Sequence, residues 1–120
     1  MDEHDALATV VRDTLVNIAG VSGTAAKHLR PGQSLDADLG LDEVDLEVLA
    51  GCQCRLGDCL RCDRGATRID ADELRDGTVA DVVILTVRHA LRRRLDAVEA
   101  RELIARVQAG LRGPGGTFRD

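Results

Sequence analysis

The chain has 120 residues, enough for one small domain, and 44% of them are hydrophobic although Phe118 is the only aromatic residue. Because no apolar run approaches about 18 residues and the N-terminus from Met1 to Asp5 is acidic, we expect no membrane span, no signal peptide and a cytoplasmic location. The net charge is −5, and residues 1–50 hold ten acids against three bases, which disfavours nucleic acid as a partner.

A first amphipathic helix is predicted from Glu3 to Ala19, with Gly20 as its stop. Its apolar residues recur every three or four positions, as on one face of a helix: Leu7, Val10, Val11, Leu15 and Ile18. A long loop from Ser22 to Leu41 follows, with Pro31-Gly32 inside it and little periodicity. Long loops of this kind in small domains are often functional.

A second helix is predicted to begin at about Asp42 and to end near Gly51, and a short helical turn is predicted from Asp70 to Leu74. Thr78 and Asp81 have the spacing of a capping box, so the next helix should begin there. Its basic end, Arg92-Arg93-Arg94, suits the negative end of the helix dipole.

One more amphipathic helix is predicted from Asp96 to Leu111, capped by Asp96 and Glu99. Its apolar stripe must be buried on the rest of the chain or on a partner, and the sequence leaves both alternatives open. We expect a flexible tail over Gly113–Asp120. With almost no period-two alternation, the whole pattern predicts an all-α protein.

Two segments resemble acyl carrier proteins. Residues 38–46 read D-L-G-L-D-E-V-D-L and residues 78–83 read T-V-A-D-V-V, similar to the starts of the second and the last helix in that family. The resemblance covers about residues 3–92 and leaves residues 51–68 unmatched. It implies a carrier-like four-helix bundle over residues 1–95, with a Cys-rich insert at 51–68, an additional helix at 96–112 and a tail at 113–120.

Glu43 occupies the position at which the family has the serine that carries a phosphopantetheine arm. A carboxylate has no hydroxyl to attack the coenzyme A pyrophosphate, so we expect no arm. The resemblance then implies a binding or scaffold protein that docks on basic patches of fatty-acid, polyketide or peptide biosynthetic enzymes. The predicted docking residues are the acids at the start of the second helix: Asp38, Asp42, Glu43, Asp45 and Glu47. The three histidines are isolated, so we do not expect an enzyme, and the sequence leaves the oligomeric state open.

All of the cysteines lie within eleven residues, as C-x-C-x4-C-x2-C: Cys52, Cys54, Cys59 and Cys62. Four thiolates at such spacing can surround a tetrahedral zinc ion with a structural role. Transient disulfide or redox chemistry and plain packing of small side chains are the other interpretations. The alternative function is therefore a zinc-binding or thiol-redox regulatory module built on a helical frame.

Overall fold

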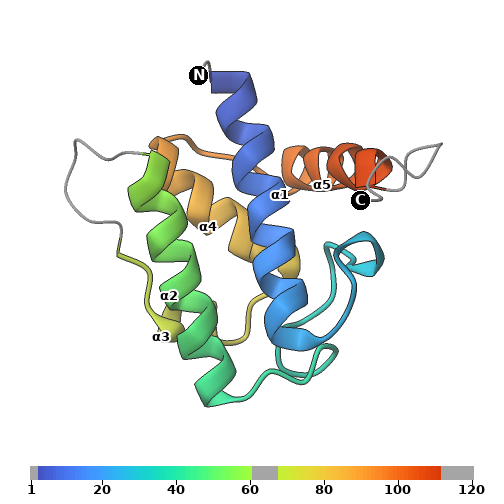
Figure 1. The fold of residues 1–120 in the computed structure, drawn as a ribbon, viewed down its shortest axis with the longest axis vertical. Helices are drawn as coiled ribbons and strands as arrows, with labels where there is room; N and C mark the ends of the chain where they lie inside the picture. The colour runs from blue at the N-terminus through green and yellow to red at the C-terminus, as the bar shows by residue number, and fades with distance from the viewer. Residues whose placement is uncertain (1–2, 61–67, 112–120) are drawn as a thin grey trace.

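The computed structural model describes residues 3–60 and 68–111, and over these ranges it is all-helical, with one isolated antiparallel bridge between Ser34 and Thr78. The elements in chain order are α1 (Glu3–Ser22), the 3-10 turn η1 (Ala26–His28), α2 (Glu43–Leu60), α3 (Ala71–Leu74), α4 (Val79–Leu91) and α5 (Ala97–Leu111) (Figure 1). None of the described helices is long and apolar enough to cross a membrane.

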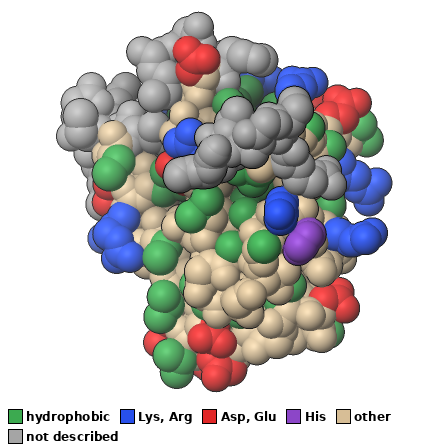
Figure 2. All heavy atoms as spheres, turned by 45° about the vertical axis from the view of Figure 1, so that its right-hand side comes forward, with side chains coloured by type: hydrophobic (Ala, Val, Ile, Leu, Met, Phe, Trp, Pro, Cys, Tyr) green, Lys and Arg blue, Asp and Glu red, His purple; other side chains and the backbone are tan. Residues whose placement is uncertain are grey.

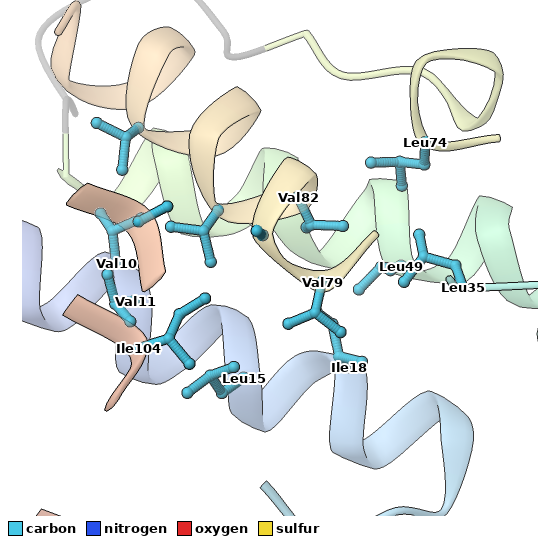
Figure 3. Close-up of a cluster of buried hydrophobic side chains, with 14 of the residues drawn as sticks. Val10, Val11, Leu15, Ile18, Leu35, Leu49, Leu74, Val79, Val82 and Ile104 are labelled. Carbon is cyan, nitrogen blue, oxygen red and sulfur yellow. The ribbon is translucent and has the colours of Figure 1, made fainter. Parts of the chain in front are cut away.

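The core lies between α1, α2 and α4, which all contact one another, and α5 closes it against α1 and α4. It is built from aliphatic side chains, several of which are fully buried (Figure 3), among them Val10, Val11, Leu15, Ile18, Leu49, Val79 and Ile104. The predicted stripe of the first helix is confirmed, since all five of its residues belong to this cluster. Burial of this apolar surface is the main driving force for folding.

A polar side chain, Gln53, sits at the centre of this core. Its amide nitrogen donates to the hydroxyls of Thr14 (2.9 Å) and Thr86 (2.8 Å). Its amide oxygen accepts from Asn17 (2.8 Å), and the Thr86 hydroxyl donates to the carbonyl of Val82 (2.8 Å). The network joins α1, α2 and α4. Because its buried amide is hydrogen-bonded at both ends, it avoids the cost of burying an unpaired polar group.

The long loop between α1 and α2 is tied to the start of α4. The amides of Leu35, Val79 and Ala80 donate to the carbonyls of Gly77, Gln33 and Pro31, each at 3.0 Å. Leu35 is also completely buried in the core. The loop is therefore a packed part of the domain, and it fixes the approach of the chain to α2.

The additional C-terminal helix is confirmed as α5, and it packs on its own chain rather than standing apart. Ala100 and Ile104 are fully buried, and Gln108 is 7% exposed. The amide of Gln108 donates to the carbonyls of Ala26 (3.0 Å) and Leu29 (2.5 Å). Hence α5 holds η1 and the first loop against α1.

Helix starts match the predicted capping residues. The Thr78 hydroxyl accepts from the amide of Asp81 (3.2 Å), while the Asp81 carboxylate accepts from the amide of Thr78 (3.0 Å). Asp96 and Glu99 form the same reciprocal pair before α5, at 2.8 and 3.2 Å. Side chains at these positions satisfy amides that the first helical turn leaves without partners.

Two predicted helix ends are wrong. The first helix passes through Gly20 to Ser22, and Gly23 with φ +83° follows it, its amide bonded to the carbonyl of Ala19. The second helix passes through Gly51 to Leu60, so the first ten residues of the predicted Cys-rich insert belong to α2. A glycine inside a helix costs only about 1 kcal/mol, and burial of Gln53 and Gly57 on the inner face of α2 favours its continuation. The predicted tail at 113–120 lies outside the described residues.

Candidate functional site

The start of α2 is capped by two of the predicted docking acids. The Asp45 amide donates to the carboxylate of Asp42 (2.9 Å), and the Asp42 amide donates to the carboxylate of Asp45 (3.1 Å). This reciprocal pair is a capping box in which both members are aspartate. The negative charges also suit the positive end of the helix dipole. These two carboxylates therefore define where α2 begins.

Glu43 is the first residue of α2, and its carboxylate forms an ion pair with Arg75, which follows α3. The guanidinium of Arg75 also pairs with Asp72 on α3. The hydrogen bond to Asp72, followed by the charge of Glu43, raises the pKa of Arg75 above its usual value. Since the Glu43 side chain is 62% exposed, the pair adds little stability. It nonetheless directs the carboxylate towards α3.

Asp38 lies in the loop before α2 and is bonded to Ser34. Its carboxylate accepts from the Ser34 amide (2.8 Å), and the Ser34 hydroxyl accepts from the Asp38 amide (3.1 Å). The chain has one other serine, Ser22, whose hydroxyl accepts from the Thr24 amide (3.1 Å) at the end of α1. Neither serine therefore stands at the start of α2.

A groove of about 420 Å³ runs between α2 and α3. Carboxylates from both helices line it, namely Glu43, Glu47, Asp70 and Asp72, around a floor that includes Ala50, Cys54 and Ile69. Figure 2 shows acidic side chains at the lower end of the molecule, where α2 begins in Figure 1. The predicted acids thus divide into a helix cap, a loop contact and one wall of this groove. Asp70 and Asp72 line the same groove from the α3 side, although their sequence pattern indicates only a helix start.

Three of the four cysteines lie on α2, and they do not face one point. Residues two apart on a helix diverge by about 200°, so Cys52 and Cys54 lie on different sides. The Cys54 sulfur is bonded to the amide (3.3 Å) and carbonyl (3.5 Å) of Ile69, whereas the Cys52 sulfur accepts from Arg55 (3.5 Å). Cys52 and Cys59 line a second groove, of about 450 Å³, with Val16 and Asn17 of α1.

Cys62 lies outside the described residues. Among the residues that are described, no group of three or more His, Cys, Asp or Glu side chains is placed to hold a metal ion. The four-ligand zinc site therefore stays a prediction from the sequence. What the structure adds is that the described cysteines divide between two sides of one helix.

No family model, no curated protein and no solved structure matches this chain. The interpretation of the site therefore depends on its own residues and on the two motifs at the helix starts.

Proposed function

We propose that this chain is a carrier-protein-like docking protein that works without a phosphopantetheine arm. The proposal is supported by the order of its elements, in which a first helix, a long packed loop, a second helix, a short third helix and a fourth helix follow one another. It is also supported by the two motifs that resemble carrier proteins, which coincide with the starts of α2 and α4. In this proposal α1 to α4 form the carrier frame and α5 is an addition to it.

The observation that carries the proposal is the chemistry of Glu43. It stands directly after the capping Asp42, at the position of the family's modified serine, and it is a carboxylate already paired with Arg75. A carboxylate at a helix start is a stable arrangement, but it offers no hydroxyl for a phosphodiester. Neither Ser22 nor Ser34 replaces it, because both hydroxyls take part in turns elsewhere in the fold.

The proposed partner is a biosynthetic enzyme of the fatty-acid, polyketide or peptide type with a basic docking patch. The start of α2 offers such a patch both charge and apolar contact. Glu43 and Glu47 are exposed acids one turn apart, and Val44 and Val48 beside them are 65% and 51% exposed. Complementary charge speeds encounter and fixes orientation, and the two valines supply apolar surface that a partner can bury.

The test of the missing arm is incubation with coenzyme A and a broad-specificity phosphopantetheinyl transferase, followed by intact-mass measurement. The wild-type mass should stay unchanged, and a gain by the mass of the arm would overturn the proposal. Glu43→Ser should turn the chain into a substrate because it restores the hydroxyl at the helix start. Glu47→Ser, one turn later on the same exposed face, is the matched control and should remain unmodified.

Docking through α2 is tested in the Glu43→Ser background by the rate of modification. A Glu47→Lys change should slow modification by about tenfold, since each wrong charge at a docking contact costs on the order of 1 kcal/mol or more. Glu102→Lys on α5 reverses an exposed charge far from α2 and should leave the rate unchanged. Equal rates in the two charge-reversed variants would argue against docking at this face.

A further inference from the structure

A separate pocket of about 210 Å³ lies between α3 and α4. Its floor is apolar, and consists of the buried Leu74 and Val82 and the half-buried Ile84 and Leu85. Leu74 comes from α3 and Val82 from α4 (Figure 3). The volume is below the roughly 300–1,000 Å³ of pockets for drug-sized ligands, so it suits a molecule of about ten non-hydrogen atoms.

Charged side chains stand at both ends of the α4 side of this pocket. Asp81 lies in the first turn of α4 and Arg88 in the last turn, and Ile84 and Leu85 lie between them. Residues at positions i, i+3, i+4 and i+7 share one side of a helix. The rise of about 1.5 Å per residue separates the Cα atoms of Asp81 and Arg88 by about 10.5 Å along the axis. The pocket therefore extends along α4, with an acid at one end and a base at the other.

The carboxylate of Asp81 is held in place but is not saturated. Its Oδ2 accepts from the Thr78 amide (3.0 Å), which fixes the side chain at the start of α4. Within residues 3–60 and 68–111, no hydrogen bond reaches its Oδ1. An ionised carboxylate offers about four lone-pair sites. Asp81 thus presents an oriented acceptor to an ammonium group in the pocket.

The guanidinium of Arg88 is available at the other end. Arg88 is exposed and forms no ion pair with another described residue. Glu73, the third charged residue that lines the pocket, is engaged elsewhere: its Oε1 accepts from the Asp70 amide (3.0 Å), and its Oε2 lies 3.8 Å from Nε2 of His89. A guanidinium binds a carboxylate through paired N–H donors. The Arg88 end therefore suits a carboxylate.

We propose that this pocket binds a short, unbranched ω-amino acid, with its ammonium group at Asp81, its carboxylate at Arg88 and its methylene chain on the apolar floor. The order of charge, apolar chain and opposite charge in the ligand then matches the order of side chains along α4. The inference does not depend on the proposed docking function, because the pocket shares no lining residue with the groove between α2 and α3.

The first test is an NMR titration of the isotope-labelled full chain with 6-aminohexanoate and with its isomer L-leucine. Both molecules contain the same atoms, but leucine has its two charges next to each other and cannot reach Asp81 and Arg88 together. 6-Aminohexanoate should shift the amide signals of Gly77 and Leu85 saturably, with a Kd at least about tenfold lower than that of leucine, which loses one charge-assisted hydrogen bond. No saturable shift up to about 50 mM, or equal affinity of the two isomers, would overturn the proposal.

The second test varies the length of the ligand, from 4-aminobutanoate to 8-aminooctanoate. Because both ends of the ligand are bound at fixed places on α4, the affinity should pass through a maximum within this series. Burial of methylene groups alone would instead strengthen binding with every added carbon. A steady rise in affinity through the whole series would therefore overturn the proposed end-to-end fit.

Arg88→Gln tests the carboxylate end, since it removes the charge of an exposed side chain and keeps a polar group. The variant should bind 6-aminohexanoate about tenfold more weakly than the wild type does. Its affinity for pentylamine, which lacks the carboxylate, should be unchanged. Arg101→Gln is the matched control on α5, outside the pocket, and should bind both ligands like the wild type. Equal affinity of Arg88→Gln and the wild type for 6-aminohexanoate would overturn the assignment of Arg88.

Asp81→Asn tests the ammonium end and keeps an oxygen that can accept from the Thr78 amide. It should weaken 6-aminohexanoate by about tenfold without weakening hexanoate, which lacks the ammonium group. Glu102→Gln removes an exposed acid on α5 and should change neither affinity. Unchanged binding of 6-aminohexanoate by Asp81→Asn, or an equal loss for both ligands, would overturn the assignment of Asp81.

Discussion

Replacing Gln53 by methionine tests whether the buried polar network holds α1, α2 and α4 together. Methionine has nearly the same volume, so the change removes the amide without opening a large cavity. The hydroxyls of Thr14 and Thr86 each lose a donor at the centre of the core, at 2.9 and 2.8 Å. Thr86 keeps its bond to the Val82 carbonyl, and the half-buried Asn17 can turn its amide towards water.

The expected cost follows from this inventory. Leaving a buried hydroxyl without its partner costs about 1–3 kcal/mol, which applies to Thr14, and Thr86 loses one of its two hydrogen bonds at a cost of about 1 kcal/mol. The free energy of unfolding should therefore fall by about 2–4 kcal/mol. This is a large share of the roughly 5–15 kcal/mol that stabilises a domain. Equilibrium unfolding in urea measures it, and the slope of free energy against urea should not change because the native fold is retained.

A triple variant separates the network from simple packing. The triple variant Gln53→Met, Thr14→Val, Thr86→Val replaces both hydroxyls that accept from Gln53 by apolar groups of similar shape. It should recover at least half of the lost stability. The reasoning is refuted if Gln53→Met costs less than about 0.5 kcal/mol, the range of an inconsequential substitution. It is also refuted if the triple variant is no more stable than the single one.

Three further predictions concern the backbone and the thiols. Arg92 ends α4 with φ +56°, a backbone conformation that costs an arginine more than a glycine. Arg92→Gly should therefore raise the free energy of unfolding in urea by about 1 kcal/mol. A lower value would indicate that the arginine side chain contributes more than the backbone strain costs. Gly77→Ala should lower the free energy of unfolding by about 1 kcal/mol or more, because the added Cβ would lie 3.1 Å from the Leu74 carbonyl oxygen. A urea unfolding midpoint equal to that of the wild type would mean that this turn shifts freely. The predicted zinc site should add one zinc ion to the native mass, lost on chelation, whereas a metal-free mass with four titratable thiols would reject it.

Helix starts were predictable from the sequence because capping is local chemistry. Thr78 and Asp96 each bond to a side chain or amide only three positions away, so the pattern contains the whole interaction. Helix ends were less predictable. Gly20 and Gly51 are compatible with both continuation and termination, and the outcome depends on whether the next turn can be buried, which the sequence alone does not state. Of Gly20, Gly23 and Gly51, Gly23 alone has the positive φ that favours glycine after a helix.

The contacts that could not be predicted from the sequence are the polar ones between residues far apart in the chain. Gln53 interrupts an otherwise apolar inner side of α2, which is the one signal that it has a buried partner. Its partners lie 33 to 39 positions away, on two other helices. Likewise the position of Glu43 was predictable, but its pairing with Arg75 depends on how α3 approaches α2.

The contact of Gln108 with the first loop has a consequence for biosynthesis. The carbonyl of Ala26 accepts from the amide of Leu29 and also from the side chain of Gln108, 82 positions later in the chain. During translation, therefore, α1 and its loop are complete well before the helix that secures them has left the ribosome. Until then the surfaces of α1 and α4 that Ala100 and Ile104 cover remain accessible to water. The native packing of this domain should accordingly form only after α5 has left the ribosome, and nascent chains that end before α5 should be the ones that chaperones and proteases engage.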